Sequence, residues 1–206
     1  MLKIITHTKI YYCVLLIALV FPRSSFSQTK TNMAVFENLV DSSAAVISKA
    51  IPADSRNLSF NFVFGNEYNL FKDHFLTYFI NKNYTIVTQG NKGQEIVDID
   101  YTINNANVKY GDIFRSGFLG SFKVPRIINF SGSYIINSSP SIGKEFNYSY
   151  IDTVNYGNIH NLENISYPVT KGDVPPEPFL GSLLEPVVAI GTAAVVIFLF
   201  FAIRSK

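Results

Sequence analysis

The chain has 206 residues, of which 48% are hydrophobic and 16% charged, with 17 basic and 15 acidic side chains. Its formal net charge of +2 is too small for a typical nucleic-acid-binding protein, so we expect no nucleic-acid partner. The single cysteine, Cys13, lies near the amino terminus, so we expect no disulfide, zinc–thiolate site or cysteine nucleophile in the remainder of the chain.

The first 27 residues have the layout of a secretory signal peptide. Lys3 and Lys9 form a basic head, residues 11–21 an apolar middle, and residues 25–27 a small-x-small cleavage site. Cleavage there also removes Arg23 and leaves 14 basic and 15 acidic residues. An uncleaved signal anchor is the alternative, although about eleven apolar residues are short for a bilayer.

Residues 183–203 form the longest apolar stretch, with no charged side chain after Glu185. A helix rising about 1.5 Å per residue would extend over about 30 Å here, the thickness of a bilayer core. We therefore expect a transmembrane helix, with residues 204–206 as a basic cytoplasmic tail and the bulk of the protein on the other side. A buried core helix and a removable lipid-anchor signal are the alternatives.

Two amphipathic patterns between these ends predict helices. Residues 33–50 place apolar side chains at helical spacing between Asn32, a suitable N-cap, and Pro52, which stops a helix. Residues 67–81 repeat this spacing with a strongly aromatic stripe.

Alternating or β-branched patterns predict five strands, at residues 58–64, 84–88, 96–110, 126–137 and 145–154. In the four longer ones, aromatic or aliphatic side chains alternate with Asn, Ser, Thr or Asp. An antiparallel sheet with one face on helices and the other in water produces that alternation. We therefore predict an α+β fold over residues 28–167, a two-layer domain whose mainly antiparallel sheet carries both helices on one face. A Pro-rich linker at residues 168–182 follows the domain.

The sequence holds few groups that could carry chemistry. Asp98 and Asp100 place two carboxylates on one strand face, which could hold a divalent metal as in sugar-transfer enzymes, although a solvated strand face explains them better. His74 and His160 lack metal-site spacing, and neither a phosphate-binding loop nor a nucleophile elbow is present. We therefore expect no enzymatic activity, no metal and no cofactor.

The connector at residues 112–125 mixes glycines, aromatic rings and cations, a composition suited to lipid headgroups or to a partner protein. An ordinary strand connection whose Phe side chains tuck under the sheet is the alternative. The candidate partner-binding residues are Arg115, Phe118, Leu119, Phe122, Lys123 and Arg126. Three small residues of the apolar stretch could let two such helices pack closely in lipid, namely Ala189, Gly191 and Ala193.

Three stretches within residues 33–110 suggest a family: LSFNFVF at 58–64, FLTYFINKNYTIVT at 75–88 and VDIDYTI at 97–103. With the leading helix, this run resembles small bacterial envelope α/β domains. These include the amino-terminal domain of the Tol-system propeller protein, the curli-secretion channel subunit and flagellar outer-membrane accessory proteins. The resemblance implies a non-catalytic assembly or transport-accessory role, and it assigns no functional residue.

We therefore expect a membrane-anchored binding or scaffold protein of the cell envelope, or an accessory subunit of a larger membrane assembly or transport complex. It would span the bacterial inner membrane once, with its main domain in the periplasm and other envelope proteins as partners; a homo-oligomer is compatible with this. One alternative is a membrane-tethered enzyme that uses Asp98 and Asp100 on envelope saccharides. Another is a carrier of an apolar ligand between sheet and helices.

Overall fold

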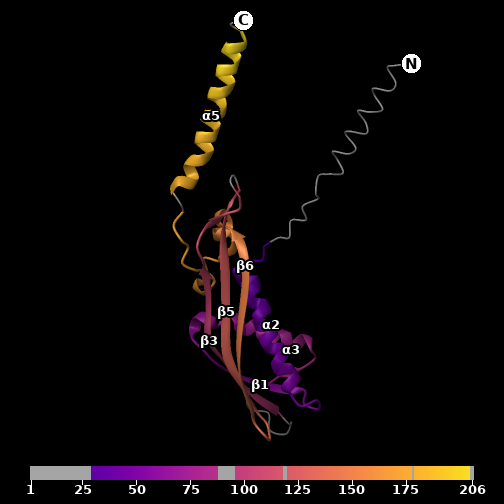
Figure 1. Ribbon diagram of the computed structural model, residues 1–206. Helices are drawn as coiled ribbons and strands as arrows, with labels where there is room; N and C mark the ends of the chain where they lie inside the picture. Colours follow the sequence, from indigo (N-terminus) through magenta and orange to yellow (C-terminus); the bar gives the residue numbers. More distant parts are fainter. Residues whose placement is uncertain (1–28, 88–95, 118–119, 178, 205–206) are drawn as a thin grey trace, which may run out of the picture.

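The computed structural model describes residues 29–87, 96–117, 120–177 and 179–204 (Figure 1). The expected signal peptide at residues 1–27 and Ser205 and Lys206 of the expected tail lie outside these residues. The helices are α2 (Asn32–Ala50), α3 (Leu70–Asn81), α4 (Ile159–Leu162) and α5 (Phe179–Arg204), with 3-10 turns at Asn66–Tyr68, Tyr156–Asn158 and Pro168–Thr170. The strands are β1 (Asn57–Val63), β2 (Thr85–Ile86), β3 (Ile96–Tyr110), β4 (Phe114–Arg115), β5 (Phe122–Asn137) and β6 (Ile142–Asn155).

The predicted helix at residues 33–50 is confirmed as α2, but its cap differs from the expected one. Thr31 accepts a hydrogen bond from the backbone N–H of Ala34 at 3.2 Å, so Thr31 is the N-cap. Asn32, the expected cap, is the first helical residue and is fully buried. Its side chain is therefore available to a buried polar network, described below.

The six strands form one mixed sheet, so the prediction of a mainly antiparallel sheet holds only for part of it. β3, β5 and β6 are antiparallel neighbours, and the two-residue β4 pairs with the start of β5. β1, however, lies parallel to both β2 and β3. α3 links β1 to β2, and such a helical crossover lets the chain return to the sheet in the same direction.

An aromatic core lies between the sheet and the helix pair α2–α3 (Figure 1). Phe75 of α3 stacks on Tyr101 of β3, with ring centroids 4.2 Å apart, and Phe36 of α2 meets Phe130 of β5 edge-on at 6.4 Å. These four rings are buried, as expected for side chains on the apolar face of each predicted element. The α+β character predicted from the two periodicities is thus confirmed.

The opposite face of the sheet carries hydrogen-bonded polar side chains. The amides of Asn61 and Asn137 donate to the two oxygens of Asp100, at 2.9 and 3.2 Å. Asn129 donates to Asn107 at 3.2 Å in the same cross-strand manner. This face therefore satisfies much of its own hydrogen bonding while it remains accessible to water or to a partner.

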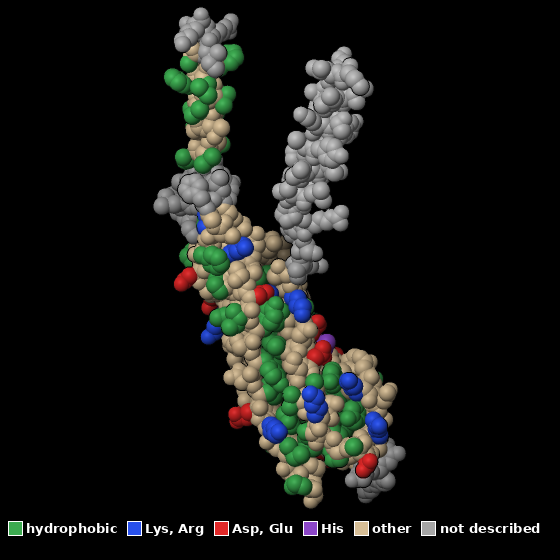
Figure 2. Space-filling model, turned by 45° about the vertical axis from the view of Figure 1, so that its right-hand side comes forward, with side chains coloured by type: hydrophobic (Ala, Val, Ile, Leu, Met, Phe, Trp, Pro, Cys, Tyr) green, Lys and Arg blue, Asp and Glu red, His purple; other side chains and the backbone are tan. Residues whose placement is uncertain are grey.

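The carboxyl-terminal helix α5 begins at Phe179, within the segment expected to be a linker. Ten large apolar side chains between Val187 and Phe201 are exposed by 42–69%, and Figure 2 shows such side chains projecting from this helix above the domain. Within the residues that the structure describes, no helix combines the length and apolar character needed to cross a membrane. The transmembrane helix expected at residues 183–203 is therefore not supported by those residues.

Candidate functional site

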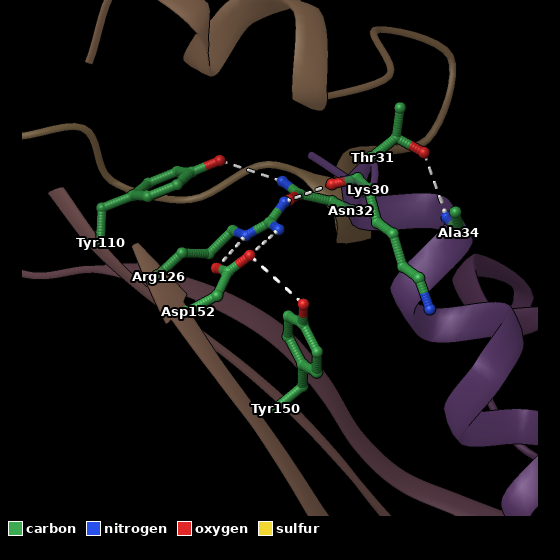
Figure 3. A network of polar contacts seen from close by, with 8 residues as sticks. All are labelled: Lys30, Thr31, Asn32, Ala34, Tyr110, Arg126, Tyr150 and Asp152. Atoms are coloured by element: carbon green, nitrogen blue, oxygen red, sulfur yellow. Dashed lines mark hydrogen bonds and ion pairs between the residues drawn. The ribbon is translucent and has the colours of Figure 1, made fainter. Parts of the chain in front are cut away.

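A buried polar network surrounds Arg126, whose side chain is 0% exposed (Figure 3). Its guanidinium donates two hydrogen bonds to the carboxylate of Asp152, from Nε to Oδ1 at 2.9 Å and from Nη2 to Oδ2 at 2.6 Å. Its Nη1 donates to the side-chain oxygen of Asn32 at 2.6 Å and to the carbonyl of Lys30 at 2.9 Å. Because these bonds balance the buried positive charge, the guanidinium can remain inside the fold.

Asn32 extends the network to two further segments. Its amide nitrogen donates to the hydroxyl of Tyr110 at 3.0 Å and to the carbonyl of Thr170 at 2.7 Å. Burial raises the pKa of Tyr110 to about 12, although the hydrogen bond from Asn32 opposes that rise. The network thus fastens the segment before α2 and the segment that leads to α5 to one end of the sheet.

The network arises from a simple sequence pattern that the assignment of Arg126 to a partner-binding connector does not include. Arg126 occupies the same face of β5 as the buried Ile128 and Phe130, and its partner in β6 is Asp152. Two opposite charges at apolar positions of neighbouring strands indicate a buried ion pair. Treating Arg126 as part of the connector obscured this relationship.

The other connector residues form a β-hairpin from β4 and β5. Phe114 lies opposite Lys123, and Arg115 lies opposite Phe122. The guanidinium of Arg115 is 4.7 Å from the ring centre of Phe122, which is a cation–π distance. Phe114 is 45% exposed. Phe118 and Leu119, also expected to bind a partner, lie outside the described residues.

The root of this hairpin packs against the segment that precedes α5. Ile113 and Tyr156 both pack on a small apolar cluster that contains Val124, Val154, Ile159 and Leu162. The hydroxyl of Tyr156 donates to the carbonyl of Pro175 at 3.2 Å, four residues before α5 begins. The hairpin and the departure point of α5 therefore lie at the same end of the sheet, which Figure 1 also shows.

The expected carboxylate pair lies on the polar face. Asp98 is exposed, and both oxygens of Asp100 accept hydrogen bonds from asparagine side chains. His74 lies 2.9 Å from Asp41, and His160 belongs to α4 in another part of the fold. Across the part of the chain that the structure describes, no group of three or more His, Cys, Asp and Glu side chains is arranged to hold a metal.

An open hollow of about 390 Å³ lies beside β1, where Phe60 and Phe62 face Lys72 and Leu76 of α3. The Lys72 ammonium is 5.3 Å from the ring centre of Phe62. The three small residues expected to let two helices pack closely, Ala189, Gly191 and Ala193, are exposed on α5. The structure thus brings together Arg115, Phe122 and Lys123, separates them from the buried Arg126, and places the three small residues on another element.

Comparisons with known proteins give little further information. No protein-family model matches the chain, and no curated protein matches it. A minor lipoprotein from Acinetobacter baumannii is 6% identical over 51% of this chain and 69% of its own, with a TM-score of 0.33. A neuraminyllactose-binding hemagglutinin homologue from Helicobacter pylori is 11% identical over 49% of this chain and 68% of its own, with a TM-score of 0.26. Neither similarity is high enough to assign a fold or a function to this chain.

Proposed function

We propose that the chain is a non-catalytic binding or scaffold protein of the bacterial cell envelope, attached to a membrane through α5. The observation that carries the proposal is the exposure of large apolar side chains between Val187 and Phe201 of α5. Residues 195–201 are seven consecutive large apolar residues, so no side of this helix is polar. Such a helix needs a non-aqueous environment.

The energetic cost of leaving α5 in water is large. Fully burying one exposed large apolar side chain contributes roughly 1.5–3 kcal/mol, so the remaining 42–69% exposure of these ten corresponds to roughly 10 kcal/mol or more. The core of the α+β domain does not bury these side chains, because it is formed by side chains from α2, α3 and the sheet. A lipid environment would supply the missing apolar contacts.

The domain has features of a binding module. Its polar face runs across β3, β5 and β6, and it presents asparagine, serine and threonine side chains with exposed Ile135 and Ile151 among them. Mixed polar and aliphatic surfaces of this kind suit protein partners. We therefore propose that this face, held near a membrane, binds other envelope proteins.

Membrane attachment can be tested with the full-length chain in native membranes. We expect it to resist extraction by high salt and by alkaline carbonate. Replacing Val195 and Leu199 by Arg should release it, because each charge at the centre of a membrane helix costs about 2.5–3.5 kcal/mol. The matched control exchanges the same two residues for Leu and Val. Full-length protein in the soluble fraction, or an arginine variant that stays attached, would contradict the proposal.

The binding role has a separate test. After mild detergent extraction and chemical cross-linking, we expect the chain to co-purify with other envelope proteins. Recovery of the chain alone, at the mass of a monomer, would argue against a scaffold. Replacing Asp98 and Asp100 by Asn should leave any cellular phenotype intact, and its loss would instead favour the saccharide-enzyme alternative.

A further inference from the structure

The β4–β5 hairpin has an unusual distribution of side chains for a strand connection. Residues opposite each other in an antiparallel pair share a face, so Phe114 lies beside Lys123 on one face and Arg115 beside Phe122 on the other. Each face thus presents one aromatic ring next to one cation. The two faces differ in exposure. Phe114 is 45% exposed, whereas Arg115 and Phe122 are half-buried on the face that continues to the buried Val124.

The charge of the hairpin is uniform in sign. Residues 114–123 contain two basic side chains and no acidic one, and the exposed Asp112 precedes them. Aromatic rings next to Lys or Arg are typical of groups that lie at the level of lipid headgroups, where the ring enters the acyl boundary and the cation meets phosphate. The exposed Phe114 ring beside the Lys123 ammonium therefore matches the boundary between acyl chains and phosphates at an anionic lipid surface.

The position of the hairpin agrees with its composition. Lys123 at the start of β5 pairs with Asn155 at the end of β6, and the following residue, Tyr156, bonds to Pro175 shortly before α5. In Figure 1, α5 departs from this end of the sheet. A membrane that receives α5 would therefore face the hairpin.

We propose that the β4–β5 hairpin is a second membrane contact, which rests on an anionic lipid surface beside α5 and sets the orientation of the domain. This inference rests on the proposed attachment through α5. Phe114 supplies the apolar contact, and Lys123 supplies the attraction to lipid phosphates, while Arg115 packs on the half-buried ring of Phe122. With two contacts instead of one, the polar face of the sheet would be held in a defined direction.

The sequence contains no tryptophan, so a single introduced tryptophan is a clean reporter. The test places it at Phe114 (Phe114→Trp) in the full-length chain, reconstituted into vesicles of phosphatidylcholine and phosphatidylglycerol that carry brominated acyl chains. The matched control is Ile135→Trp, because Ile135 is also 45% exposed and lies on β5, the strand that pairs with β4. It is twelve residues from Lys123, or about 40 Å along the strand.

We expect the emission of the tryptophan at 114 to shift to shorter wavelength and to be strongly quenched by the brominated lipids, while the reporter at 135 is unaffected. An unquenched tryptophan at 114, in protein that still floats with the vesicles, would overturn the hairpin contact and leave attachment through α5 intact. Protein that does not float with the vesicles would overturn both. A shift of the emission at 114 without quenching by lipid would replace the lipid surface by contact with a second copy of the chain, the protein present in these vesicles.

A charge variant tests the electrostatic part. Lys123→Gln should weaken the quenching at 114 in vesicles with phosphatidylglycerol and reduce its dependence on salt. Lys144→Gln, an exposed lysine near the other end of β6, should change neither. Equal quenching in the Lys123 variant and the parent at every salt concentration would overturn the role of the cation.

Discussion

Arg126 and Asp152 form a two-point ion pair inside the fold, with nitrogen–oxygen distances of 2.9 and 2.6 Å. The arginine is 0% and the aspartate 22% exposed, so the pair lies largely out of water. Through Asn32 and Lys30 it also holds the chain segment in front of α2. The pair therefore connects the sheet to the segment before α2 and, through the bond from Asn32 to Thr170, to the segment before α5.

We predict that Arg126→Met lowers the free energy of unfolding by about 3–5 kcal/mol, because removal of one partner leaves a largely buried carboxylate without its counter-ion. Urea unfolding followed by circular dichroism measures the change. Lys109→Met, at an exposed position of neighbouring β3, is the control and should change stability by less than about 0.5 kcal/mol.

A double variant distinguishes the loss of the ion pair from the cost of leaving one buried charge unpaired. Arg126→Met combined with Asp152→Leu should be considerably more stable than Arg126→Met alone, because no uncompensated charge remains. A loss of less than about 1 kcal/mol in the single variant would show that the pair contributes little to the fold.

Close packing at Gly132 supports a second prediction. A Cβ atom there would lie 2.0 Å from the carbonyl oxygen of Thr102 and 2.6 Å from the Phe146 ring, near the register shift between Ile103 and Asn105. Gly132→Ala should therefore lower the free energy of unfolding by about 1–3 kcal/mol. Thermal or urea unfolding measures it.

Gly143→Ala is the matched control for this substitution. Its Cβ would be 3.8 Å from the nearest atom, a side-chain carbon of Ile135, which is ordinary contact. We expect a change within about 0.5 kcal/mol. Equal effects of the two substitutions would mean that the close approach at Gly132 is absent in solution.

The elements that the sequence predicted best are those in which the pattern of apolar and polar side chains repeats over many residues. α2, β3, β5 and β6 match their predicted ranges within a few residues, because side-chain alternation directly reflects which face is buried. The alternation within β1 does not reveal its direction, but the predicted order of strand, helix and strand over residues 58–88 favours parallel pairing of β1 with β2, a signal that the prediction of a mainly antiparallel sheet left out. Its direction depends on the crossover through α3, which is a property of the chain path.

The polar network was only partly within reach of sequence reasoning. Arg126 and Asp152 stand at apolar positions of two adjacent strands, a signal that was present and missed. The role of Asn32 could not be found in this way, because an asparagine at a helix start is normally a cap. Thr31 takes the cap instead, and this follows from tertiary contacts that position Asn32 against Arg126.

A hydrogen bond between α2 and β3 supports a third prediction. The Ser43 hydroxyl lies 2.8 Å from that of Tyr101 and donates to the carbonyl of Val40, so Tyr101 donates to Ser43. Ser43→Ala should lower stability by about 1–3 kcal/mol, because it leaves the buried tyrosine hydroxyl without an acceptor. Ser42→Ala, one residue away and exposed, should have little effect.

A double-mutant cycle isolates this bond. Adding Tyr101→Phe to Ser43→Ala removes the orphaned hydroxyl, so the double variant should lose less than the two single variants together, with a coupling of about 1 kcal/mol. Strict additivity would show that the two hydroxyl groups do not interact in solution.

The buried tyrosines make the domain sensitive to alkali. Burial raises the pKa of Tyr110 to about 12, and it also raises the pKa of Tyr101, Tyr134, Tyr148 and Tyr150. In the unfolded chain a tyrosine ionises near pH 10, so between pH 10 and 12 the unfolded state binds fewer protons than the folded state. Stability is therefore full below pH 10 and falls as the pH rises; Tyr110 alone contributes up to about 1.4 kcal/mol per pH unit to this decline between pH 10 and 12.

We predict that Tyr110→Phe makes this alkaline decline less steep, because one of the groups that cause it is removed. At pH 8 the same variant should be less stable than the parent by about 1 kcal/mol, since Asn32 loses one hydrogen-bond acceptor. Urea unfolding at intervals between pH 8 and 12 measures both effects. Tyr167→Phe, which removes a 37% exposed tyrosine, is the control and should leave the parent profile unchanged. An unchanged slope in the Tyr110 variant would show that this hydroxyl reaches water in the folded protein.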